Sequence, residues 1–327
     1  MAINIDAMNR MDEPSREILG LSRTHLTAFV VLLLVAAVAP FFVYPVFLMK
    51  VMCFALFACA FNLLLGFGRL LSFGHAAYFG SASYISAHAA KVWGLTPELS
   101  ILAGVFVAAI LGAVIGALAV RRQGIYFAMV TLAFAQMVYF FALQAPFTGG
   151  EDGIQSVPRG DLFGVVSLTS DFSLYWVVLA ITFFGLFAIH RIVFSPFGQV
   201  LKAIRENEAR AMSLGHRVNL YKVSVFVMSA ALSGLAGATK AQVFQVATLS
   251  DVHWSMSGEV VLMTLLGGMG TLFGPVAGAA AIISMQSFLA PFGAWLTVIH
   301  GVIFVVAVLM FREGIVGVLN KRLKLSL

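Results

Sequence analysis

Charged residues are scarce in this chain. Only 10% of its 327 residues are Asp, Glu, Lys or Arg, whereas soluble domains carry about 25%. Hydrophobic residues make up 61% of the sequence and the mean hydropathy is +0.99. No soluble core of this length needs so much apolar material, so the composition indicates a polytopic membrane protein. The apolar runs are long and continuous, which excludes the short alternating segments of a transmembrane β-barrel.

The chain also lacks the usual signatures of catalytic sites. It has no G-x-x-x-x-G-K-[ST] sequence and therefore cannot cradle ATP phosphates itself. H-E-x-x-H, C-x-x-C and G-x-S-x-G are absent too, and the histidines share no ligand spacing. Cys53 and Cys59 lie six residues apart in one apolar run, which is typical of packing residues. We expect no catalytic residue, no metal site and no cofactor bound by this chain.

Ten apolar segments approach the length of a bilayer span, which needs roughly 20 residues. They are residues 25–44, 46–65, 70–90, 98–119, 124–143, 173–190, 222–240, 256–271, 273–290 and 294–311. The segment 256–271 is the shortest of them. The sequence therefore predicts an all-α polytopic membrane protein with about ten transmembrane helices.

The positions of Lys and Arg predict the orientation of these spans. If the N-terminus is cytoplasmic, all of the 20 basic residues lie on the inside except four. The exceptions are Lys50, Lys91, Arg159 and Lys240. We therefore interpret the net charge of +6 as a topology signal rather than a nucleic-acid-binding surface. Both termini are predicted to be cytoplasmic, with an N-terminal segment 1–24, a membrane domain 25–312 and a C-terminal tail 313–327.

A charged segment, SPFGQVLKAIRENEARAMSLG, separates two apolar blocks at residues 195–215. Ser195 suits a helix N-cap, Pro196 the first helical position and Gly215 a helix end. The sequence predicts a cytoplasmic helix over about 196–214. Two interpretations remain open from the pattern alone: a solvated amphipathic helix, or a coupling helix that docks on a soluble motor protein.

Several motifs in this chain resemble, in order, those of the permeases of hydrophobic amino acid ABC importers. RENEARAMSLGH at 205–216 resembles their variant coupling motif, although Glu208-Ala209 is followed here by Arg210. The other matches are NLLLGFGRLLSFGHAAYFG at 62–80, GIYFAMVTLAFAQM at 124–137, TGGEDGI at 148–154, GGMGTLFGPVAGA at 267–279 and FREGIVGVL at 311–319, where Glu313 replaces a common Pro. The resemblance runs from about residue 40 onward and is greatest to the LivM-type permeases of branched-chain amino acid importers.

This resemblance implies a bacterial inner-membrane subunit that works with several partners. They would be a homologous second permease, two cytoplasmic ATPase subunits that use ATP and Mg, and a periplasmic substrate-binding protein. The coupling residues would be Arg205, Glu206, Glu208 and Gly215. The substrate would be a branched-chain or other hydrophobic amino acid, with urea or small amides as the alternative.

Polar residues and glycine breaks inside the apolar segments indicate where substrate passes. The candidates are Asn62, Gly74, His75, Gln136, Glu259, Gly268 and Gly274. The broken segments 66–74 and 267–275 share a G-x-G-x-L…F-G order. Helix packing through small residues and interhelical hydrogen bonds is the competing interpretation.

Two other functional classes remain. An ATP-independent channel or secondary carrier would lack the large coupling segment, and would be expected to show paired carboxylates or a proton relay. A membrane-embedded enzyme would need a nucleophile and a base, and the sequence shows no such pair.

Overall fold

The computed structural model describes residues 23–164 and 166–293, with isolated positions beyond. The expected span 294–311 and the tail 313–327 lie almost wholly outside the described residues, as do residues 1–22. The α-helices are α2 (Arg23–Val38), α3 (Pro45–Asn62), α4 (His75–Lys91), α5 (Pro97–Ala119), α6 (Ile125–Gln144), α7 (Asp171–Phe194), α8 (Pro196–Glu206), α9 (Glu208–Ser213), α10 (Val218–Phe244), α11 (Trp254–Gly267) and α12 (Gly274–Leu289). A π-helical stretch, Leu63–Phe67, continues α3.

Short elements complete the described chain. The 3-10 helices are Ala39–Phe41, Pro146–Thr148, Gly150–Asp152, Leu249–Asp251 and Ala290–Phe292. The strands are β1 (Ile154–Gln155), β2 (Asp161–Leu162), β3 (Val166–Ser167) and β4 (Val246–Ala247). They form two antiparallel pairs, β1 with β4 and β2 with β3.

Five helices are long and apolar enough to cross a membrane: α3 with its π-helical continuation, α5, α6, α7 and α10. They coincide with five of the expected spans. Two further expected spans correspond to shorter apolar helices, His25–Phe41 and Gly274–Leu289. The chain is therefore a multi-pass membrane protein, and the count of ten spans stays a prediction.

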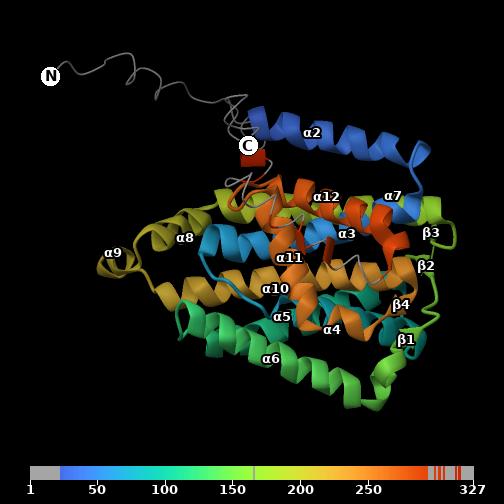
Figure 1. Ribbon diagram of the computed structural model, residues 1–327, viewed down its shortest axis with the longest axis horizontal. Helices are drawn as coiled ribbons and strands as arrows, with labels where there is room; N and C mark the ends of the chain where they lie inside the picture. Colours follow the sequence, from blue (N-terminus) through green and yellow to red (C-terminus); the bar gives the residue numbers. More distant parts are fainter. Residues whose placement is uncertain are drawn as a thin grey trace.

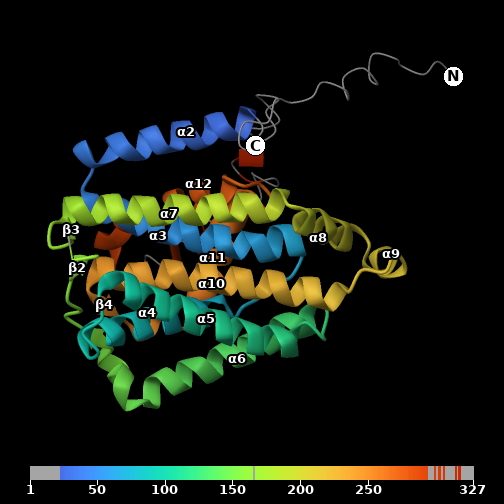
Figure 2. The same cartoon turned by 180° about the vertical axis from the view of Figure 1, so that it is seen from behind.

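Helices α3 and α10 form the centre of the bundle. Helices α4 and α5 pack on α10, and α7 and α12 pack on α3 (Figures 1 and 2). The α3 span is 78% buried, whereas the α6 span at the periphery is 22% buried. Alanine and glycine on α4, α5 and α10 allow close packing: a Cβ on Gly234 would clash with Ala108, and one on Gly237 with the Phe79 carbonyl.

Two expected spans, 70–90 and 256–271, correspond to shorter helices in the structure. Helix α4 begins only at His75, and α11 has 14 residues, about 21 Å, too short for a core of about 30 Å. Helix α11 crosses the bundle, since Ser257 contacts Ala76 at the start of α4 while Thr264 contacts Ala58 of α3.

Side-chain hydroxyls cap the buried start of α4. The Ser72 hydroxyl accepts from the Gly74 amide at 3.2 Å and the Ser257 hydroxyl from the Ala76 amide at 2.9 Å. Thr131 accepts from the Phe73 amide at 3.2 Å. The first amides of a helix have no intrahelical partner, and water is excluded here, so these hydroxyls permit a helix to start at depth.

The two ends of the bundle differ in structure. Helices α8 and α9 extend beyond one end, and the four strands lie at the opposite end (Figures 1 and 2). We call these the coupling end and the strand end. The TGGEDGI sequence belongs to the strand end, where Gly153 has a φ of +68° and no room for a Cβ beside the Ala247 carbonyl.

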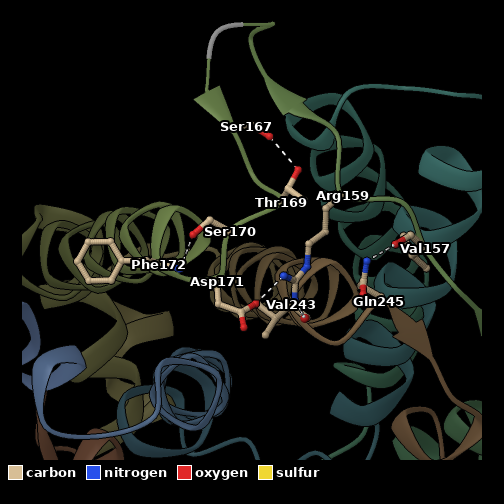
Figure 3. Close-up of polar contacts among 9 residues, drawn as sticks. All are labelled: Val157, Arg159, Ser167, Thr169, Ser170, Asp171, Phe172, Val243 and Gln245. Carbon is tan, nitrogen blue, oxygen red and sulfur yellow. Dashed lines mark hydrogen bonds and ion pairs between the residues drawn. The ribbon is translucent and has the colours of Figure 1, made fainter.

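The loop before α7 is anchored to the end of α10 (Figure 3). Arg159 donates to the Asp171 carboxylate at 2.6 Å and to the Val243 carbonyl at 2.8 Å. Gln245, which ends α10 in a left-handed conformation, donates to the Val157 carbonyl at 3.2 Å. These contacts hold the acidic, glycine-rich loop against the strand end.

Candidate functional site: the coupling segment and the glycine junction

The segment 195–215, which we call the coupling segment after its predicted role, was predicted to form one helix over about 196–214 but forms two helices. Ser195 caps α8, accepting from the Gly198 amide at 3.3 Å, and Pro196 is its first residue, as predicted. Helix α8 ends at Glu206, because Asn207 is extended and its side chain accepts from the Arg210 amide at 3.0 Å. Asn207 thereby caps a second helix, α9. The prediction of a continuous helix was wrong because Asn207 competes for backbone hydrogen bonds.

Gly215 ends α9 as the sequence predicts. Its φ is +86°, a region that suits glycine, and no atom lies near the position of a Cβ. The His216 amide donates to Ala211 O at 3.2 Å and the Gly215 amide to Met212 O at 3.0 Å. This pair of bonds is a Schellman motif.

Glu208 is bound within this chain. Its carboxylate forms an ion pair with Lys222 of α10 at 2.8 Å and accepts from Gln123 at 3.4 Å. The contact fixes α9 against the start of α10. Glu206 is exposed and its side chain contacts no described residue through a hydrogen bond or ion pair.

Arg205 points inward, toward the broken segment that follows α3. Its Nη1 donates to the Gly66 carbonyl at 2.5 Å, and its own carbonyl accepts from Arg69 Nη1 at 3.3 Å. Both bonds join α8 to the segment 63–69. The carbonyl of Gly66 lies in a π-helical turn, where the regular hydrogen-bond ladder is interrupted.

A cavity of about 380 Å³ lies beside Arg205. It is lined by His25, Phe67, Phe194, Lys202, Arg205, Glu206, Gly270 and Leu272. The Lys202 ammonium lies 4.9 Å from the centre of the Phe194 ring. Burial and the nearby charge of Arg205 lower the pKa of Lys202.

The two glycine-broken segments meet at this place, and we call their contact the glycine junction (residues 62–68 and 268–271). The Asn62 amide donates to the Thr271 carbonyl at 2.8 Å, and Asn62 Oδ1 accepts from the Gly270 amide at 3.0 Å. A Cβ on Gly66 would lie 2.7 Å from the Gly270 nitrogen. Asn62, one of the predicted pathway residues, therefore ties the two breaks together from a buried position.

Gly74, the N-cap residue of α4, and Gly274, the first residue of α12, are buried, and a nearby hydroxyl accepts from the amide of each. Ser72 accepts from the Gly74 amide, and Thr271 accepts from the Gly274 amide at 3.1 Å. Gly268, which belongs to the junction, has a φ of +123°. Because these glycines have no side chain, backbone atoms of neighbouring segments can approach them closely.

The remaining predicted pathway residues are dispersed. His75 is fully buried, and its Nε2 lies 2.9 Å from the Ser229 hydroxyl. Gln136 lies partly buried on α6. Glu259 of α11 accepts from Gln286 of α12 at 3.2 Å. Only Asn62 and Gly268 belong to the glycine junction, and none of the seven candidates lines the cavity beside Arg205.

Sequence reasoning missed Arg69, Lys222 and Thr271. The glycine breaks indicate that segments 62–80 and 267–279 contribute to the substrate pathway. They do not indicate that Asn62 and Thr271 are in contact. One signal was available for Thr271: like Ser72, it is a hydroxyl residue a few positions before a helix-starting glycine.

A family model for the permease component of branched-chain amino acid transport systems matches residues 43–311 of this chain. The chain belongs to this family. Its members are permeases of ABC transporters. The matched region contains the coupling segment and the glycine junction. It also contains the predicted spans through residue 290, except the first, 25–44.

Individual relatives agree with this assignment. The chain is 29% identical to the LivM permease protein of Salmonella typhimurium over 248 residues, 69% of this chain and 58% of the relative. LivM of Escherichia coli is 28% identical over the same shares. The ribose import permease RbsC of Bacillus subtilis is 27% identical over 199 residues, 55% of this chain and 58% of the relative. The chain thus spans less than two thirds of their length, and no solved structure matches.

Proposed function

We propose that this chain is the membrane-spanning subunit of an ATP-driven importer of branched-chain or other hydrophobic amino acids. The family match and the LivM relatives support this function. The complete importer would contain a second permease, two ATPase subunits that use ATP and Mg, and a periplasmic binding protein in a bacterial inner membrane. Similarity to a ribose import permease makes a sugar the second candidate substrate.

The coupling segment is the observation that carries the proposal. Helices α8 and α9 extend beyond the end of the bundle (Figures 1 and 2). Met212 is 54% exposed and Leu214 is 71% exposed, beside the charged residues Glu206 and Arg210. Exposed apolar side chains rimmed by charges are typical of protein-binding surfaces. An ATPase that moves on binding ATP would act on this surface.

We predict that the coupling end is cytoplasmic and the strand end periplasmic. Single cysteines at Ser156 or Ser170 should then react with an impermeant thiol reagent from outside intact cells, and a cysteine at Ser213 should react only after lysis. Cys53 and Cys59 are buried and can be replaced beforehand. Labelling of position 213 from outside would reverse the proposed orientation.

Docking of the ATPase should depend on Leu214. Burial of a leucine on binding contributes about 1.5–3 kcal/mol, so Leu214→Lys should weaken ATPase binding about tenfold or more. The measurement is the amount of ATPase that copurifies with the permease at decreasing concentration. Ser213→Lys is the matched control, because it adds the same charge one residue away without removing apolar surface. Equal copurification of both variants would contradict the docking surface.

The transport function itself is tested with the complete complex in proteoliposomes. We expect ATP-dependent uptake of leucine, isoleucine or valine that requires the binding protein. Uptake of ribose without uptake of any amino acid would favour the sugar alternative. Uptake that needs no ATP would favour the channel or secondary carrier.

A further inference from the structure

The cavity beside Arg205 brings two basic side chains together at the coupling end. Lys202 and Arg205 of α8 both line this space of about 380 Å³. They are three positions apart in one helix and therefore share a face of it. Burial and the nearby charge of Arg205 lower the pKa of Lys202, so an anion between the two side chains would stabilise both charges.

Neither basic side chain has an acidic partner among the described residues. Lys202 takes part in none of their ion pairs, and its ammonium lies 4.9 Å from the centre of the Phe194 ring instead. Arg205 uses Nη1 for the Gly66 carbonyl, which fixes the guanidinium and leaves its other N–H groups for a ligand. A guanidinium held in this way can bind two oxygens of a phosphate group at once.

The remaining lining of the cavity is largely apolar. Phe194 and the buried Leu272 belong to it, and His25 of α2 packs against Phe194 with the ring centres 5.0 Å apart. The carboxylate of Glu206 also lines the cavity, but Glu206 is exposed and forms no ion pair with the described residues. The cavity thus combines two positive charges with apolar walls, which suits a ligand that is anionic at one end and apolar at the other.

The helix that contributes His25 borders the lipid. Helix α2 lies at the periphery of the bundle and begins toward the coupling end (Figures 1 and 2). Further along it, Val31 and Leu34 are each 58% exposed and Val35 is 63% exposed. Apolar side chains exposed on a membrane-embedded helix contact acyl chains. A phospholipid can therefore place its headgroup in the cavity while its acyl chains lie along α2.

We propose that the cavity beside Arg205 binds the phosphate group of an anionic phospholipid. The phosphate oxygens accept from the Lys202 ammonium and from the N–H groups of Arg205 that do not contact Gly66. Basic pockets between membrane-spanning helices on the cytoplasmic side are the kind of site that holds anionic headgroups. This site goes beyond substrate import and rests on the proposed function only for placing the coupling end at the cytoplasmic surface.

A soluble phosphate anion presents the same oxygens to Lys202 and Arg205 but has no acyl chains. The two sources of phosphate differ in what they gain from α2, because only a lipid buries apolar surface there. A lipid should therefore bind more tightly than inorganic phosphate. A zwitterionic lipid should bind more weakly than an anionic one, because its headgroup carries a cation that the two basic residues repel.

The experiment titrates the purified permease–ATPase complex with phosphatidylglycerol and counts bound lipids by native mass spectrometry. Lys202→Met should weaken binding by about tenfold or more, as expected for losing a hydrogen bond to a charged group. Glu206→Gln should strengthen it about twofold, because an exposed charge that repels the phosphate is removed. Arg210→Gln is the matched control: it removes a positive charge from the same coupling segment, at an exposed position outside the cavity.

Equal phosphatidylglycerol binding by Lys202→Met and Arg210→Gln would overturn the site, and so would equal binding of phosphatidylcholine. Competition by inorganic phosphate at the concentration at which the lipid binds would assign the cavity to a soluble anion and reject the lipid. Lys202→Arg keeps the charge and should retain binding, and thermal unfolding of each variant is measured in parallel. Leucine uptake by the unsubstituted complex tests the importer function separately, so uptake without these lipid effects would reject the site alone.

Discussion

Replacing Arg205 with glutamine should leave the ATPase subunits bound but reduce leucine uptake per ATP hydrolysed by about tenfold, a coupling loss within the roughly 5–150-fold range common between linked sites. Arg205 is the residue of α8 that donates to the Gly66 carbonyl. Through this bond a displacement of α8 would reach the glycine junction. Glutamine is shorter and uncharged, so the motion of α8 would no longer be transmitted at this point.

The measurement compares uptake and ATP hydrolysis in proteoliposomes that contain the complete complex. Arg210→Gln is the matched control, because Arg210 is also exposed on the coupling segment but its side chain contacts no described residue. Arg205→Lys retains one charged donor and should recover part of the coupling. If Arg205→Gln loses the ATPase instead, Arg205 belongs to the docking surface and does not transmit the motion.

Local features of the sequence predicted several parts of this structure. Low charge and long apolar runs predicted a multi-pass helical membrane protein. Ser195 and Pro196 marked the start of α8, and Gly215 the end of α9. These features depend on residues close in sequence, whose preferences are set by backbone geometry and by the absence of water from the membrane core.

Contacts between distant residues could not be predicted in the same way. The sequence shows two glycine-rich breaks but not that Asn62 joins them. It indicates Glu208 as a coupling residue but not that its carboxylate is paired with Lys222. It presents 256–271 as a span, although α11 crosses the bundle and caps α4 through Ser257. Each difference comes from a tertiary contact that competes with the local preference.

Gly66→Ala should destabilise the permease and abolish most of its transport. The added methyl group would meet Asn62 Oδ1 and lie 2.7 Å from the Gly270 nitrogen. These are the two atoms that form the hydrogen bond across the glycine junction. The methyl group would have to displace these two atoms and weaken this bond, so we expect a cost near the upper end of the range for overpacking, about 3 kcal/mol. The measurements are thermal unfolding of the purified complex and leucine uptake.

Gly68→Ala is the control for this prediction. Gly68 lies two residues further in the same G-x-G sequence and has a right-handed backbone conformation, with a φ of −95°. A Cβ on Gly68 would find its nearest neighbour, Val225, at 3.8 Å, an ordinary contact. Alanine is therefore tolerated there, and both stability and uptake should remain close to those of the unsubstituted protein. Equal stability of the two variants would show that residues 62–68 and 268–271 can move apart enough to admit a methyl group at Gly66. The close contact at Gly66 would then not be needed to hold the glycine junction together.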